Sequence, residues 1–196
     1  MSDGQKQTRK RLVVGMSGAS GAPLTIELLR QLRAYQDEIE VHFVMTKSAQ
    51  LTLLQETAYS VQQLYELADV VYDEGSIGAG PASGSFRTMG MAVVPCSMKT
   101  LAGIVSGYSD NLVLRAADVT LKEHRKLVLV PRECPLSNIH LRNLYEAGQA
   151  GAVIIPPVLS YYNHPASVED CTRHIVGKIM DQFGLACSDF RRWEDA

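Results

Sequence analysis

Short apolar runs alternate along the chain with longer amphipathic stretches, and this pattern is the main indication of the fold. The apolar runs cover residues 12–16, 41–45, 91–94, 127–130 and 152–155. They are rich in β-branched residues and continuous rather than alternating, which is typical of strands that are covered on both faces. Amphipathic periodicity predicts helices near residues 23–35, 48–57, 60–68, 98–106, 109–123, 138–148 and 167–184.

The alternation of strands and helices predicts an α/β fold with a mostly parallel sheet and right-handed crossovers. A length of 196 residues fits one domain of ordinary size. We expect that domain to span residues 11–185, with a flexible N-terminal tail at residues 1–10 and a C-terminal tail at residues 186–196.

Composition excludes several classes of function. Hydrophobic residues make up 46% and charged residues 20% of the chain, which is globular composition. A formal net charge of −2 argues against nucleic acid as a partner. No apolar run approaches the roughly 18 residues of a membrane-spanning helix, so no membrane insertion is expected. Residues 1–11 are polar and show no secretory signal, so the expected location is cytoplasmic.

The cysteines predict neither a metal site nor a disulfide framework. Cys96, Cys134, Cys171 and Cys187 form no C-x-x-C pair, and the five histidines add no zinc spacing.

Polar residues gather where three of the predicted strands stop. Pro95, Pro131 and Pro156 are each expected to end a strand, because proline cannot donate to the hydrogen-bond ladder. Polar segments follow them at residues 96–100, 132–135 and 161–164. In open parallel sheets, ligands bind outside the carboxyl ends of the strands. These segments are therefore candidates for a binding site.

The turn at residues 15–21 has the composition of a phosphate cradle. Small residues in Gly18-Ala19-Ser20-Gly21 allow close approach of a ligand, and the amides that open the next helix attract anions. Ser17 and Ser20 are expected to add hydroxyl donors. The second strand ends in Met45-Thr46-Lys47-Ser48, without the acid that would hold a dinucleotide ribose, so a mononucleotide fits better.

Four further segments leave a functional and a plain structural interpretation open. Ser97-Met98-Lys99-Thr100 offers amide and hydroxyl donors, while Ser97 also caps a helix. Arg132-Glu133 is suited to phosphate binding and proton transfer, or forms a surface ion pair. The run from Leu121 to Lys126 contains Lys122 and can equally be a solvated face. The glycine-rich residues 73–90 are a mobile lid or a surface loop.

Several of these segments together resemble the UbiX/Pad family of flavin prenyltransferases. The matching segments are Gly18-Ala19-Ser20-Gly21, Pro95-Cys96-Ser97-Met98-Lys99-Thr100-Leu101-Ala102-Gly103, Arg115-Ala116-Ala117-Asp118-Val119, Leu121-Lys122-Glu123, Leu127-Val128-Leu129-Val130-Pro131-Arg132-Glu133, Gly151-Ala152-Val153-Ile154 and Tyr162-Asn163-His164-Pro165. The resemblance extends from about residue 11 to residue 193.

The resemblance implies a three-layer Rossmann-like or flavodoxin-like fold and a homo-oligomer, a dodecamer, with FMN at subunit junctions. It implies transfer of a dimethylallyl group from dimethylallyl phosphate to reduced FMN, first to N5 and then to C6. The product, prenylated FMN, would serve a UbiD-type decarboxylase of aromatic acids. Quinone synthesis and detoxification of phenolic acids both remain open as the pathway.

The resemblance also assigns residues by position. Gly18, Ala19, Ser20, Thr46, Ser97, Met98, Lys99, Thr100 and Arg132 match contacts to FMN. Glu133, Ser20, Glu56 and Lys122 match catalytic positions. Lys122, Arg132, Tyr162 and Lys178 match the substrate phosphate site, and Trp193 matches a family aromatic residue. Some members have arginine at position 178 and a tryptophan in the loop at residues 75–78, and this sequence has neither.

Two other enzyme classes and one non-enzymatic role compete with the prenyltransferase interpretation. A flavin-dependent cysteine decarboxylase has a related fold but differs at residues 96–99. The second enzyme class is an aromatic acid decarboxylase subunit, and the non-enzymatic role is that of a flavin carrier. The sequence lacks the Asp-Asp-x-x-Asp motif that holds magnesium in other prenyltransferases, and we expect fixed cations to take that role.

Overall fold

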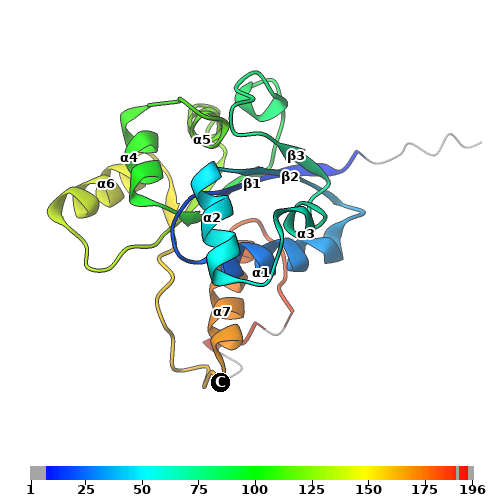
Figure 1. Ribbon diagram of the computed structural model, residues 1–196, viewed down its shortest axis with the longest axis vertical. Helices are drawn as coiled ribbons and strands as arrows, with labels where there is room; N and C mark the ends of the chain where they lie inside the picture. Colours follow the sequence, from blue (N-terminus) through cyan, green and yellow to red (C-terminus); the bar gives the residue numbers. More distant parts are fainter. Residues whose placement is uncertain (1–7, 189, 194–196) are drawn as a thin grey trace, which may run out of the picture.

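A computed structural model describes residues 8–188 and 190–193, and they form an α/β sandwich of three layers (Figure 1). All described strands pair in parallel in one six-stranded sheet, in the order β3-β2-β1-β4-β5-β6. The strands are β1 Lys10–Met16, β2 Ile39–Met45, β3 Val70–Tyr72, β4 Gly90–Cys96, β5 Lys126–Pro131 and β6 Val153–Ile154. The predicted three-layer fold with a parallel sheet is confirmed.

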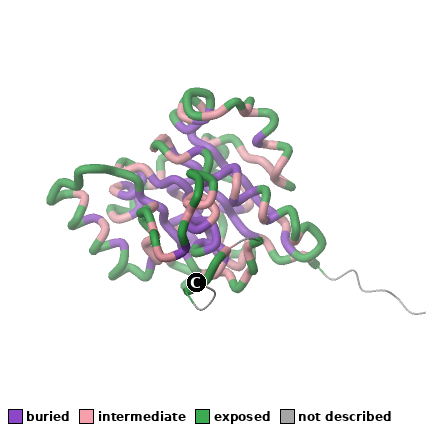
Figure 2. Tube along the Cα trace, turned by 90° about the horizontal axis from the view of Figure 1, so that it is seen from below, coloured by how far each residue is buried: buried purple, intermediate pink, exposed green. Residues whose placement is uncertain are grey.

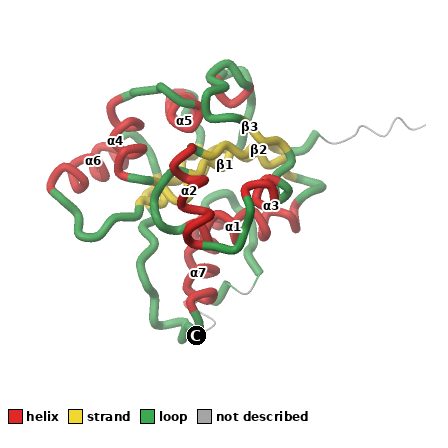
Figure 3. Tube along the Cα trace, in the orientation of Figure 1, coloured by secondary structure: helices red, strands yellow, loops and turns green. Residues whose placement is uncertain are grey.

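Helices cover both faces of the sheet, as Figure 3 shows. The helices are α1 Ala22–Leu32, α2 Lys47–Glu56, α3 Val61–Tyr65, α4 Met98–Ser106, α5 Leu112–Lys122, α6 Asn138–Gln149 and α7 Val168–Asp181. Two short 3-10 turns are η1 Arg33–Tyr35 and η2 Gly80–Ala82. No helix in the described part of the chain is long and apolar enough to span a membrane.

The buried core has two halves, one on each face of the sheet. On one face α1, α2, α3 and α7 pack around Phe43, Leu12 and Met16. On the other face α4, α5 and α6 pack around Met91, Leu127 and their neighbours. Figure 2 shows buried residues in the middle of the molecule and exposed residues on its outside. Strands buried on both faces explain why their sequences are continuously apolar.

The strand order reverses between β1 and β4, and this is where a doubly wound sheet opens a crevice for a ligand. The turns that follow β1 and β4 meet at this point. They contain the small-residue turn at residues 17–21 and the Ser97 segment, so the two candidate segments of the sequence come together.

Three details of the strands differ from the sequence prediction. Pro95 does not end β4, because the ladder shifts register between Val93 and Cys96 and resumes where Cys96 pairs with Pro131. The last strand, β6, is two residues long and stops before Pro156. The short strand β3 was not predicted, since its three residues are only half-buried and give no apolar run.

Both predicted tails contain residues that are attached to the domain. Arg9 donates to Gln36 O at 2.9 Å and pairs with Asp69 at 2.8 Å, and β1 already begins at Lys10. At the other end, Ala186 O accepts from the Tyr35 hydroxyl at 2.9 Å. The described residues between 186 and 193 therefore extend the domain beyond residue 185, while residues 1–7, 189 and 194–196 lie outside the described part.

Residues 73–90 pack against α5 rather than over the crevice that follows β1 and β4. Arg115 Nε donates to Ala82 O at 3.2 Å, and Arg125 Nη1 donates to Phe86 O at 2.8 Å. These contacts support the interpretation of the segment as a surface loop.

Candidate active site

Ser17 locks the two turns of the crevice together. Its hydroxyl donates to Pro95 O at 3.1 Å and accepts from the amide of Ser97 at 2.8 Å. The Ser17 residue is buried, with 1% of its surface exposed. Its one proton and its acceptor are therefore used inside the protein, and the prediction that Ser17 is a ligand donor is wrong. The sequence did not reveal this role because its partners lie about 80 residues away.

Gly18 is required by a close approach between the first turn and α2. A Cβ atom at position 18 would lie 2.4 Å from the Ser48 hydroxyl oxygen and 3.1 Å from the Ser48 backbone. Thr46 begins α2 as its N-cap, accepting from the amide of Ala49 at 3.2 Å, and its hydroxyl lies 3.0 Å from that of Ser48. The turn and the helix thus form one compact wall of the crevice.

Glu56 supplies the anion at the N-terminus of α1. Its Oε2 atom accepts from the amide of Gly21 at 2.8 Å and from the amide of Ala22 at 2.9 Å. A carboxylate is stabilised at this end of a helix, because the first amides have no partner within the helix. The prediction that these two amides bind a ligand phosphate is therefore wrong.

The same environment keeps Glu56 ionised. Partial burial by itself would raise the pKa of Glu56. Hydrogen bonds from the Ser20 side chain and the two amides, together with the charge of Arg132, outweigh burial and lower the pKa. Glu56 is thus an acceptor at neutral pH, in contact with Ser20 and within the field of Arg132.

The N-terminus of α4 is the open anion site of the crevice. Ser97 accepts from the amide of Thr100 at 3.2 Å, and the two hydroxyl oxygens lie 3.0 Å apart. The amides of Met98 and Lys99 open the helix, and no partner for either occurs among the described residues. Helix N-terminal amides with a lysine beside them fit a phosphate group. Of the residues matched to FMN, this group fits the phosphate best.

Arg132 and Glu133 stand exposed at the end of β5. The amide of Arg132 donates to Cys96 O at 3.2 Å, so the segment continues directly from the β4–β5 ladder. The Glu133 carboxylate accepts from the amide of Cys134 at 3.1 Å. A guanidinium and a carboxylate in this position can contact a ligand that lies over the turns.

An apolar cavity of about 400 Å³ adjoins Ser20 and Glu56. Its walls include Leu24, Val158 and Ile175, with further residues from the loop after β6 and the first turns of α7. The sequence analysis assigned no role to this wall, because its residues come from three separate segments. A cavity with apolar walls and one ionised carboxylate at its edge can hold a small hydrocarbon group beside a proton acceptor.

Within this chain, Lys122 lies near the amino end of β5, whereas the crevice lies at the carboxyl ends of the strands. Lys122 is the last residue of α5, which runs away from the carboxyl ends of the strands, and β5 begins four residues later. Six residues of strand β5 span about 20 Å, and this strand separates Lys122 from Arg132. The Lys122 ammonium group contacts Glu123. One chain therefore does not bring Lys122 to Ser20, Glu56 or Arg132.

Tyr162, Lys178 and Trp193 gather around α7. Lys178 is on the helix, Tyr162 lies in the loop before it, and Trp193 follows it in the chain. The ring centroid of Tyr162 lies 5.6 Å from that of His174 and 5.1 Å from that of Trp193. The Lys178 ammonium lies 5.5 Å from the ring centroid of Phe190. No hydrogen bond or ring contact within the described residues links this group to the crevice. The described residues also contain no group of three or more His, Cys, Asp or Glu that could hold a metal ion.

Comparison with known proteins gives consistent results. The Flavoprotein family model matches residues 1–182. The chain is 51% identical over 184 residues to a probable UbiX-like flavin prenyltransferase of Sedimentibacter hydroxybenzoicus, covering 94% of this chain and 97% of the relative. A dodecameric FMN-dependent Ubix-like decarboxylase from Escherichia coli O157:H7 superposes with a TM-score of 0.92 at 52% identity, covering 93% and 98% of the two chains. The structure of AnUbiX (PadA1) in complex with FMN and dimethylallyl pyrophosphate also gives a TM-score of 0.92, at 51% identity, covering 95% and 98%.

Proposed function

The chain belongs to the UbiX-like family of flavin prenyltransferases, and we propose that it transfers a dimethylallyl group from dimethylallyl phosphate to reduced FMN. When bound, reduced FMN supplies the nucleophilic N5 and C6 atoms that the group joins. The prenylated FMN is then available to a UbiD-type decarboxylase. The observation that carries this proposal is the ionised Glu56, held by Ser20 and two amides beside an apolar cavity.

In this proposal the crevice performs three tasks. The amides of Met98 and Lys99 hold the flavin phosphate at the start of α4, where helix amides favour an anion. The apolar side chains of the cavity contact the allyl group beside Glu56. Glu56 orients the Ser20 hydroxyl and accepts the proton that the prenyl acceptor, reduced FMN, gives up.

The leaving phosphate needs cations and one proton donor, and the crevice itself provides Arg132 and Glu133 for these roles. Lys122 lies at the far end of α5, and no hydrogen bond or ring contact within the described residues joins Tyr162 or Lys178 to the crevice. We infer that they complete the site of another protomer in a homo-oligomer. The dodecameric relative supports this arrangement, because a closed assembly places several surfaces of one chain beside those of its neighbours.

Mass spectrometry of the bound flavin tests the proposal directly. Purified protein with reduced FMN is incubated anaerobically with dimethylallyl phosphate or with dimethylallyl pyrophosphate, the ligand of the AnUbiX (PadA1) complex. We expect FMN with one added five-carbon unit, formed faster from the monophosphate and at the same rate with EDTA present. Unmodified flavin with both donors would contradict the proposal, and a faster reaction with pyrophosphate would change the donor.

A decarboxylase of aromatic acids is the second candidate, and the similar Escherichia coli O157:H7 structure is named an FMN-dependent Ubix-like decarboxylase. Carbon dioxide release from 4-hydroxybenzoate-type acids distinguishes the two. We expect none from this protein alone, since ordinary FMN is a poor acceptor for the carbanion that decarboxylation leaves. Release should appear only when an apo UbiD-like protein and the prenyl donor are both added. Release by this protein alone would favour the decarboxylase, and a flavin carrier would show neither activity.

A further inference from the structure

The C-terminal residues 190–193, here called the C-terminal strap, lie along one face of α7. Phe190 packs over Gly177, with its ring centroid 5.4 Å from that of His174. Arg192 donates twice to the Asp181 carboxylate, at 2.6 and 3.1 Å. Positions 174, 177, 178 and 181 recur at the spacing of one helix face. The strap is thus attached at several points along the last two turns of α7.

Gly177 makes room for the strap. A Cβ atom at position 177 would lie 2.4 Å from the Phe190 ring, a distance that real side chains do not adopt. The position has no unusual backbone angle that would itself require glycine. The glycine therefore serves the close approach of an aromatic ring to the helix.

Lys178 and Tyr162, the two candidate phosphate-binding residues of this region, both contact rings of the strap. The Lys178 ammonium lies 5.5 Å from the Phe190 centroid, within the range of a cation–π contact. Tyr162 is held between two rings, edge to face against His174 and against Trp193 of the strap. Displacement of the strap would therefore release one side of Tyr162 and the ring beneath Lys178 together.

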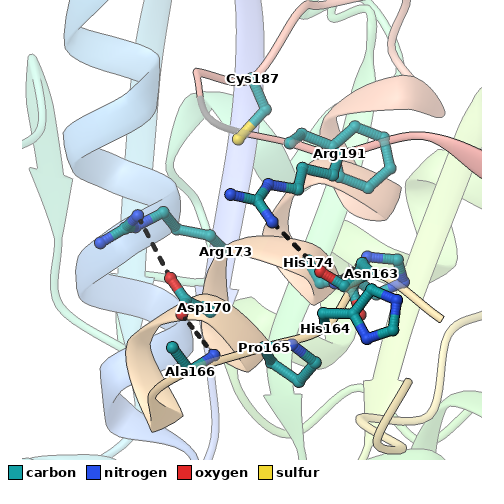
Figure 4. Close-up of a pocket in the computed structure, with 10 residues that line it drawn as sticks. Asn163, His164, Pro165, Ala166, Asp170, Arg173, His174, Cys187 and Arg191 are labelled. Atoms are coloured by element: carbon teal, nitrogen blue, oxygen red, sulfur yellow. Dashed lines mark hydrogen bonds and ion pairs between the residues drawn. The ribbon is translucent and has the colours of Figure 1, made fainter. Parts of the chain in front are cut away.

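Asn163, which follows Tyr162 in the chain, lies beside His174 (Figure 4). The side-chain amide nitrogen of Asn163 lies 3.3 Å from His174 Nδ1, and both residues are buried. Arg191 of the strap donates to Asn163 O at 3.4 Å. Burial, and then the charge of Lys178, lower the pKa of His174, so its ring is neutral and does not repel that ammonium.

We propose that the C-terminal strap, through Phe190 and Trp193, is a positioning device that sets Tyr162 and Lys178 for the phosphate of the prenyl donor. The inference rests on the proposed function, and it adds residues to which no contact with the substrate has been assigned. Phe190 and Gly177 act through other side chains and are positioning residues. The flavin should bind independently of them, because the crevice amides lie on other elements.

The test displaces the strap without removing it. Gly177→Ala places a methyl group against the Phe190 ring, and Gly148→Ala is the matched control, because position 148 is also in a helix and a Cβ there meets nothing within 4 Å. We expect Gly177→Ala to lower kcat/KM for dimethylallyl phosphate roughly ten-fold, as misplaced binding groups do, with FMN affinity unchanged. Gly148→Ala should behave like the wild type.

A double-mutant cycle separates positioning from general destabilisation. Tyr162→Phe removes the hydroxyl that the strap is proposed to place, and it should lower kcat/KM by itself. Combined with Gly177→Ala, it should cost less than the product of the two single effects, because both changes act on one contact. Phe190→Leu serves as the second variant should Gly177→Ala fail to fold, and it should give the same coupling.

Three outcomes would overturn the inference. These are wild-type kinetics in Gly177→Ala or Phe190→Leu, a fully multiplicative double variant, and wild-type kinetics in Tyr162→Phe. Failure of the proposed function itself is distinguishable, because the wild-type protein would then form no prenylated flavin from either donor.

Discussion

At the scale of single residues, Glu56 links the fold to the chemistry. Its carboxylate takes the place that a ligand anion would otherwise occupy at α1, and it holds Ser20 at the edge of the apolar cavity. We therefore propose that the flavin phosphate binds at the N-terminus of α4 instead. A helix N-terminus is a candidate anion site only when no side chain of the protein already fills it.

Replacement of Glu56 by glutamine should affect catalysis more than stability. The folded-state pKa of Glu56 is lowered, so its stabilising effect is present above the ordinary value and is lost as pH falls through the folded pKa. The side chain is largely exposed, so we expect Glu56→Gln to cost less than about 1 kcal/mol at pH 7. Urea unfolding should show this difference shrinking as the pH is lowered below 4.5, the ordinary pKa of glutamate. We expect the prenyl transfer rate to fall by roughly ten-fold or more, because the proton acceptor is lost.

Replacement of Glu133 by glutamine should be the more severe change. Within the described residues, the only hydrogen-bond partner of the Glu133 carboxylate is the amide of Cys134. The carboxylate can therefore contact a ligand. We expect Glu133→Gln to retain FMN and to slow transfer by about 100-fold or more, as loss of a general acid or base does. Single-turnover absorbance of the flavin measures the rate, and a near-native rate would place the proton donor elsewhere.

At the scale of elements, the crevice depends on the close approach of a turn to α2. Gly18→Ala should destabilise the protein by about 1–3 kcal/mol, the usual cost of overpacking, because the new Cβ would meet both the Ser48 hydroxyl and its backbone. Gly78→Ala is the matched control, since position 78 is also in a loop and has nothing within 4 Å. FMN titration and urea midpoints should both shift for Gly18→Ala only. Equal behaviour of the two variants would show that the turn and α2 move apart at no cost in stability, and would contradict the prediction.

The elements that the sequence predicted well are those whose signals are local. Strands β1, β2, β4 and β5 have continuous apolar runs because both faces are covered, whereas β3 has three half-buried residues and no such run. Ser17 could not be assigned from sequence, because its role depends on a carbonyl and an amide of the next turn. The distant position of Lys122 was in principle foreseeable, since a crossover helix must end at the opposite edge from its beginning.

At the scale of the whole molecule, the candidate site is distributed over three surfaces of one chain. The crevice has Glu133, the far end of α5 has Lys122, α7 has Lys178, and the loop before α7 has Tyr162. An enzyme that needs Lys122 and Glu133 at one phosphate requires more than one protomer. The relative in the dodecameric structure provides a precedent for such an assembly.

Mixing two inactive variants tests whether the site is shared between protomers. Lys122→Met should raise KM for dimethylallyl phosphate and lower kcat together, since a fixed cation holds both the bound phosphate and the leaving charge. Glu133→Gln should be slow for a different reason, the loss of the proton-transfer group. If Lys122 acts in a neighbour's site, random mixed oligomers should contain about a quarter of sites with both groups intact. Activity should therefore return when the two variants are dissociated together and reassembled, but not when each is treated alone. If Lys122 served the site of its own chain, every site in the mixture would keep one defect, and no activity would return.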